Sequence, residues 1–114
     1  MKQQRAYELM IIHDGDLDDA TVQEEIKTAR STLEGAGATV AKVDYWGRRR
    51  FAYPINHKNE GYYSVYEVLA EGGALDPVER AFRIADSVVR HKVIRLPDAE
   101  AERRGLLGDG EGTE

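Results

Sequence analysis

The alternation of hydrophobic and polar residues predicts four β-strands. Residues 6–13 carry apolar side chains on both faces of an extended chain, which is typical of a strand inside a sheet. Residues 39–46 and 62–70 alternate in the manner of strands with two different faces, and residues 89–96 mix basic with aliphatic positions. Because Lys42 and Asp44 put charge on one face of the second strand, we expect that strand to lie at an edge or to have one face in contact with water.

Two helices are predicted between these strands. Thr21 and Glu24 have the spacing of a capping box, and Gly35 marks the end of the first helix. Asp76 followed by Pro77 marks the start of the second helix. The helical residues expected in the core are Val22, Ile26, Ala29 and Leu33 in the first helix, and Val78, Ala81, Phe82, Ala85 and Val88 in the second.

The order strand, helix, strand, strand, helix, strand predicts an α+β ferredoxin-like fold, βαββαβ. Its four-stranded antiparallel sheet has the first and third strands in the middle. Two helices cover one face, and the other face is free to bind a partner. We assign residues 1–97 to this domain. Residues 98–114 contain four glycines and six acidic residues, so we predict an acidic, mostly disordered tail.

A run of three arginines, Arg48, Arg49 and Arg50, lies between the second and third strands. Tyr53-Pro54 follows, and proline interrupts regular strand pairing. We therefore predict a basic loop that the sheet presents. Adjacent guanidinium groups repel one another unless they are solvated or matched by an anion, and they suit phosphate oxygens. The alternative is a loop that only increases solubility.

The chain has 114 residues, 41% of them hydrophobic, which fits one domain with one core. It contains no cysteine, so disulfides, thiolate metal sites and cysteine nucleophiles are excluded. With no apolar run of the roughly 20 residues that cross a bilayer, we expect a cytoplasmic protein.

The net charge of -5 hides a division into blocks. Residues 42–58 hold five basic and one acidic residue, and residues 80–96 do the same, whereas residues 59–79 hold five acidic residues and no basic one. The two basic blocks could converge into one patch in the folded chain, which is the property that phosphate binding needs.

Other kinds of site have weaker support. Acidic residues of segment 14–25 match several calcium-loop positions, but Asp19 stands where that loop needs glycine. His13, His57 and His91 lie in separate elements without metal-site spacing. An RNA recognition motif is matched in the third strand at Gly61, Tyr62 and Val65 but not at Glu60, Tyr63, Ser64 and Glu67, so base stacking on the sheet is not predicted. We expect no cofactor, no metal and no catalytic residue.

Residues 47–63 carry a specific resemblance. The matching positions are Gly47, Arg49, Arg50, Ala52, Tyr53, Pro54, Ile55, Gly61 and Tyr62. Together with Tyr7-Glu8 near the start and the segment from Arg83 to Lys92, they make the chain resemble the bacterial small-subunit ribosomal protein S-six family over about residues 5–96.

The resemblance implies a non-enzymatic, ribosome-associated structural protein. It would bind central-domain small-subunit rRNA as a heterodimer with ribosomal protein S-eighteen, without membrane or small-molecule substrate. We expect RNA or partner contacts at Arg48, Arg49, Arg50, Tyr53, His57, Lys58, Arg90 and Lys92. A small-ligand sensor or a protein adaptor on the same fold remains the alternative, because one fold hosts many functions.

Overall fold

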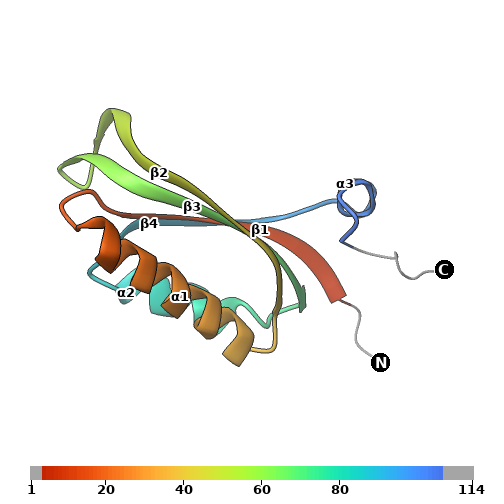
Figure 1. Ribbon diagram of the computed structural model, residues 1–114. Helices are drawn as coiled ribbons and strands as arrows, with labels where there is room; N and C mark the ends of the chain where they lie inside the picture. Colours follow the sequence, from red (N-terminus) through yellow and green to blue (C-terminus); the bar gives the residue numbers. More distant parts are fainter. Residues whose placement is uncertain (1–3, 107–114) are drawn as a thin grey trace.

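The computed structural model describes residues 4–106, and the predicted fold is confirmed (Figure 1). Its elements are β1 (Gln4–Asp14), α1 (Asp19–Gly35), β2 (Thr39–Ile55), β3 (Lys58–Glu71), α2 (Asp76–Ile84), β4 (Val88–Arg95) and α3 (Asp98–Arg103). Within the described residues, no helix has the length and apolar character needed to cross a membrane.

The four strands form one antiparallel sheet in the order β2-β3-β1-β4. The first and third strands are in the middle, as predicted, and β2 is at an edge. Leu9 of β1 pairs with Tyr66 of β3 on one side and with Val93 of β4 on the other. Helices α1 and α2 lie together under one face of the sheet (Figure 1).

The core lies between the sheet and these two helices. Leu9 and Ile11 of β1 pack with Tyr66 and Val68 of β3, and all four are almost completely buried. The four core positions predicted for α1 are also buried. Within this core the Ser64 hydroxyl donates a hydrogen bond to the Tyr66 hydroxyl at 3.0 Å, so the buried phenol group has a polar partner.

Two predictions about helix ends are wrong. The residue that caps α1 is Asp18, whose carboxylate accepts a hydrogen bond from the Thr21 amide at 2.7 Å, so Thr21 lies inside the helix. Helix α2 ends at Ile84, four residues before Val88. Val88 pairs with His13 in the sheet, so the chain must leave the helix before it reaches β4.

Burial in the second helix was therefore predicted only in part. Val78 and Phe82 are buried, but Ala81 is exposed, and Ala85 has extended backbone geometry and is half-buried. A shorter helix covers less of the sheet than the sequence pattern suggested.

The predicted basic loop is instead a long β-hairpin. Strand β2 continues through the three arginines, and Arg48, Arg49 and Arg50 pair with Tyr62, Gly61 and Glu60. The turn is made by Asn56 and His57, both at positive φ, 50° and 64°, as a two-residue hairpin turn of type I′ requires. The register of this pairing shifts at three places, between Val40 and Lys42, between Tyr45 and Gly47, and between Arg50 and Ile55. The last of these stretches contains Tyr53-Pro54.

Helix α3 lies in the segment that the sequence analysis assigns to the tail. Ala101 is fully buried against Ala6 and Leu96, and Leu106 packs beside them. Residues 107–114 lie outside the described residues, so a disordered tail stays a prediction. Within residues 98–106, the part next to β4 forms a helix on the sheet.

Candidate nucleic-acid interface

The sheet face opposite α1 and α2 is exposed over much of its area, and we call it the open face. Its side chains come from all four strands and include Met10, Ile12, Trp46, Tyr63, Val65, Arg90, Lys92 and Ile94. Two of the apolar ones face solvent, since Trp46 is 44% and Ile94 is 43% exposed. A hollow of about 200 Å³ lies between them, above Met10 and Val65.

Aromatic rings cross the open face towards the hairpin. The Trp46 ring stacks on the Tyr63 ring with centroids 5.9 Å apart, and Phe51 meets Tyr63 edge to face at 6.2 Å. The Arg49 guanidinium lies 5.7 Å from the centre of the Trp46 ring, a cation–π distance. Arg49 is thereby held over the open face.

Arg48 lies on the other side of the hairpin. Its guanidinium is 5.8 Å from the centre of the Tyr62 ring and forms an ion pair with Glu60 at 2.9 Å. Tyr62 belongs to the core on the helix side, and its hydroxyl donates to the Leu17 carbonyl oxygen. The charge of Arg48 is thus matched within the chain, and the three arginines do not form one cluster.

Lys58 also has partners within the chain. Its ammonium group is 3.2 Å from an Asp14 carboxylate oxygen and 3.1 Å from one of Asp16. Hydrogen bonds to Asp16 and then to Asp14 raise the pKa of Lys58. The acidic residues that resembled a calcium loop therefore fix the end of the hairpin through Lys58. Beside it, His57 is exposed at the turn.

Four of the predicted site residues gather around the open face with unmatched charge. Arg49, Arg50, Arg90 and Lys92 are exposed, and none of them forms an ion pair with a residue in the range 4–106. Arg50 and Arg90 line a second hollow, of about 260 Å³, together with Tyr53, which is 67% exposed. The structure brings these five residues to one region, although they come from both edges of the sheet.

Two of the acidic side chains of the open face lie at its opposite end. Glu8 and Glu67 approach Arg104, with nitrogen–oxygen distances of 3.9 Å and 3.2 Å. Arg104 also contacts Glu100 of α3 at 2.6 Å. The open face therefore has a basic end near the hairpin and an acidic end that α3 partly neutralises.

The sequence analysis did not predict Trp46, Phe51, Tyr63 or Ile94 as part of the site. The available signal was that Trp46, Tyr63 and Ile94 alternate with core residues, which indicates a second face. The predicted fold indicated that this face is free, but not which of its side chains form the site.

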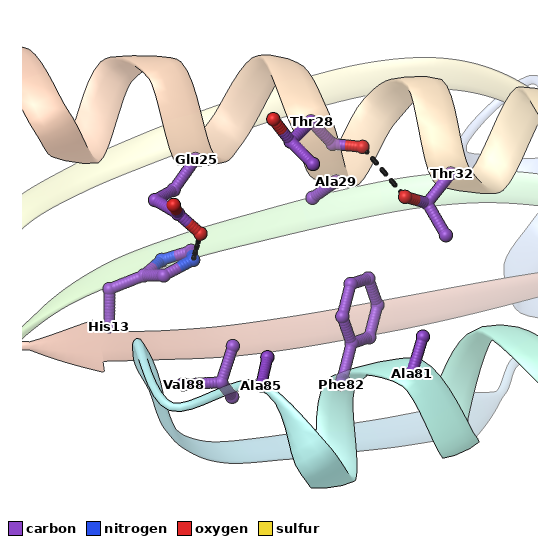
Figure 2. Close-up of a pocket in the computed structure, with 9 residues that line it drawn as sticks. All are labelled: His13, Glu25, Thr28, Ala29, Thr32, Ala81, Phe82, Ala85 and Val88. Atoms are coloured by element: carbon purple, nitrogen blue, oxygen red, sulfur yellow. Dashed lines mark hydrogen bonds and ion pairs between the residues drawn. The ribbon is translucent and has the colours of Figure 1, made fainter.

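The opposite side of the sheet has a separate pocket between α1 and α2 (Figure 2). It has a volume of about 120 Å³, and Phe82 and His13 point into the space between the helices. The buried His13 has its Nε2 atom 3.8 Å from a Glu25 oxygen, which accepts a hydrogen bond from the Ser87 hydroxyl at 2.8 Å. Burial lowers the pKa of His13, and the Glu25 charge opposes part of this shift. None of the predicted site residues lies here.

Comparisons with known proteins give one answer. The family model described as Ribosomal protein S6 matches residues 6–95. The small ribosomal subunit protein bS6 of Salinispora arenicola is 44% identical over 91 residues, which are 80% of this chain and 95% of that protein. The protein of the same name from Leifsonia xyli is 38% identical over 96 residues, 84% of this chain and 75% of its own.

A solved structure agrees with these sequence relatives. The crystal structure of 30S ribosomal protein S6 from Thermotoga maritima superposes with a TM-score of 0.83 at 27% sequence identity. The superposition covers 90% of this chain and 96% of that one, so the similarity extends over nearly the whole of both molecules.

Proposed function

The chain belongs to the ribosomal protein S6 family, and from this we propose that it binds central-domain small-subunit rRNA together with ribosomal protein S-eighteen. Family membership makes it a structural, non-enzymatic protein of the small ribosomal subunit, associated with ribosomes in the cytoplasm. The choice of RNA domain and of protein partner is the proposal.

The observation that carries the proposal is the unmatched positive charge on the open face. Arg49, Arg90 and Lys92 project from strands on a rigid sheet, and Arg50 lies beside them. Cations without a protein partner are favourable sites for phosphate, because binding releases counterions from the RNA. We propose that these four residues and Tyr53 contact the RNA or the partner.

The remaining predicted contact residues are Arg48, Lys58 and His57, and two of them have ion-pair partners within the chain. Arg48 and Lys58 are engaged with Glu60, Asp14 and Asp16, so we propose that they shape the hairpin. His57, at the exposed turn, stays a proposed contact.

The hollow between Trp46 and Ile94, which Glu8 and Lys92 also line, supports a protein partner. Trp46 and Ile94 are exposed on either side of it, and large apolar side chains of this kind are commonly buried at the centre of protein–protein interfaces. A basic partner would also offset the net charge of -5, which otherwise opposes approach to RNA. An arrangement with S-eighteen on the hollow and RNA at the basic end of the open face would fit both the exposed apolar side chains and the unmatched positive charge.

The test is binding of the purified chain to a central-domain rRNA fragment, with and without S-eighteen, across a salt series. We expect tight binding only when both proteins are present, with an affinity that falls steeply as salt rises. Replacing Arg49 and Lys92 by alanine should weaken binding, whereas Arg30→Ala, on the exposed side of α1, should not. A folded protein that binds neither RNA nor partner contradicts the proposal and favours a small-ligand or adaptor role.

A further inference from the structure

The hairpin bends across the end of the open face and joins the two edges of the sheet. Its stem belongs to edge strand β2, yet the Asn56 side-chain amide donates a hydrogen bond to the Val89 carbonyl oxygen of β4, the other edge strand, at 2.9 Å. The interruption of pairing between Arg50 and Ile55 allows the hairpin to bend towards β4. Two arginines that start on opposite edges, Arg50 and Arg90, consequently line one cavity.

This cavity is built from rigid parts. Its floor is Met10 and Ile12 of β1 with Tyr63 of β3, and Phe51 of the hairpin packs down beside them. Phe51 can approach because position 61 is glycine. A Cβ atom there would come within 2.9 Å of the Phe51 ring and 2.6 Å of the Ile12 side chain. The cavity therefore exists before any ligand arrives, which lowers the entropic cost of binding.

The lining has a pronounced chemical bias. It combines two arginines with aromatic and aliphatic side chains, and no carboxylate is among its residues. Neither arginine has an ion-pair partner in the part of the chain that the structure describes. Two cationic residues that line one cavity without a carboxylate favour an anion as its occupant. The occupant with the matching chemistry joins an anionic group to a flat, apolar ring.

We propose that this cavity receives a single unpaired nucleotide of the rRNA, with its phosphate between Arg50 and Arg90 and its base on the floor beside Tyr63 and Phe51. The inference rests on the proposed function. It specifies where on the protein the RNA is bound and that the bound nucleotide is unpaired. A cavity of about 260 Å³ is closer in size to a single nucleotide than to a base pair of a duplex. Proteins read unpaired RNA bases in this manner, by stacking on aromatic rings with charged groups on the backbone.

The first experiment measures the reactivity of individual arginines towards phenylglyoxal by mass spectrometry. The free chain is compared with its complex with S-eighteen and with the complex of both proteins and the rRNA fragment. Arg50 and Arg90 should be protected only when RNA is present, and Arg80, exposed on α2, should react equally in all three. Protection by S-eighteen alone would overturn the proposal, because the occupant would then be protein.

Ultraviolet crosslinking of the same complex tests the position of the base. Trypsin cuts after Arg50 and Lys58, so a nucleotide on the cavity floor should be attached to peptide 51–58 or to peptide 59–80. Peptide 6–27 carries Met10 and Ile12 of the same floor, so only crosslinks confined to peptides other than these three would overturn the proposal.

Variants then test whether the two arginines share one ligand. Arg50→Ala and Arg90→Ala should each weaken RNA binding roughly tenfold, and the double variant should lose less than the product, because both contact one nucleotide. Arg80→Ala is the matched control and should bind as the wild type. If the losses of RNA affinity multiply fully, the cavity proposal is overturned and the proposed function stands. The same follows if Arg50 and Arg90 stay reactive in a complex that binds RNA normally. Absence of an RNA complex contradicts the proposed function instead.

Discussion

The three consecutive arginines show how far one residue's role depends on its exact position in a strand. Arg49 is held over Trp46 on the open face, whereas Arg48 pairs with Glu60 on the other side. Irregularities in the pairing of β2 with β3, between Tyr45 and Gly47 and again after Arg50, reset the alternation of side chains. Composition predicts a basic segment here, but only the register tells which charges remain unmatched.

His13 gives the clearest prediction at this scale. Burial lowers its pKa below the ordinary value of 6.5, so below pH 6.5 the unfolded chain takes up a proton that the folded chain resists. The free energy of unfolding should fall as the pH drops from 6.5 to the lower pKa of the folded state, and this contribution should be constant above 6.5. Urea unfolding at a series of pH values measures the slope.

The variant His13→Gln separates this effect from other titrating groups. It removes the ionisable ring, so its stability should depend less on pH in that window, even if its absolute stability is lower. The lowered pKa values of Asp14 and Asp18 affect stability as the pH falls through 3.8 and below, whereas the effect of His13 begins at pH 6.5. Equal pH slopes for the variant and the wild type would show that His13 does not carry the dependence.

At the scale of elements, the sequence predicted the arrangement well and the hairpin poorly. Periodicity identified the four strands, α1 and α2, because their core faces are regular. The hairpin was mistaken for a loop because Pro54 is a local signal for broken pairing, whereas the pairing of the three arginines with β3 is a long-range contact. Tyr63 was not predicted as part of a site, because its contacts with Trp46 and Phe51 also depend on long-range strand pairing.

Gly61 is the position on which the packing of the hairpin depends. Gly61→Ala should destabilise the protein by about 1–3 kcal/mol, because the added methyl group collides with Ile12, the His13 backbone oxygen and Phe51. Urea unfolding gives the magnitude. It should also weaken RNA binding, since Phe51 can no longer close on the sheet.

The matched control is Gly35→Ala at the end of α1. A Cβ atom there meets nothing within 4 Å, and the backbone does not have positive φ. This variant should be neutral or more stable by about 0.4–1 kcal/mol, because alanine restricts the unfolded chain. If both substitutions have the same effect, close packing at Gly61 is not the reason for its glycine.

At the scale of the whole molecule, α3 closes the acidic end of the open face. Arg104→Ala removes the contacts to Glu67, Glu100 and Glu8, so α3 should leave the sheet more often. We expect faster hydrogen exchange at the backbone amides of residues 101 and 104. The free energy of unfolding of the whole protein should fall by no more than roughly 1 kcal/mol. Exchange measured by NMR distinguishes the two quantities.

Arg30→Ala serves as the control for charge removal, because it breaks an exposed ion pair with Glu34 on α1. It should leave exchange in α3 unchanged. If Arg104→Ala accelerates exchange in β1 and β3 as much as in α3, the helix is part of the cooperative core and not a separate element on its surface.

The strand order also determines when this molecule can fold during its own synthesis. Strand β1 leaves the ribosome first but lies between β3 and β4, and Leu9 needs Val93 as a neighbour. A nascent chain that lacks β4 therefore exposes one whole edge of its central strand, a template for pairing with other chains. Native structure has to wait for nearly the last residue of the domain, and pairing between such distant segments is slow. A protein of the translation machinery thus completes its sheet only when its own translation is almost finished.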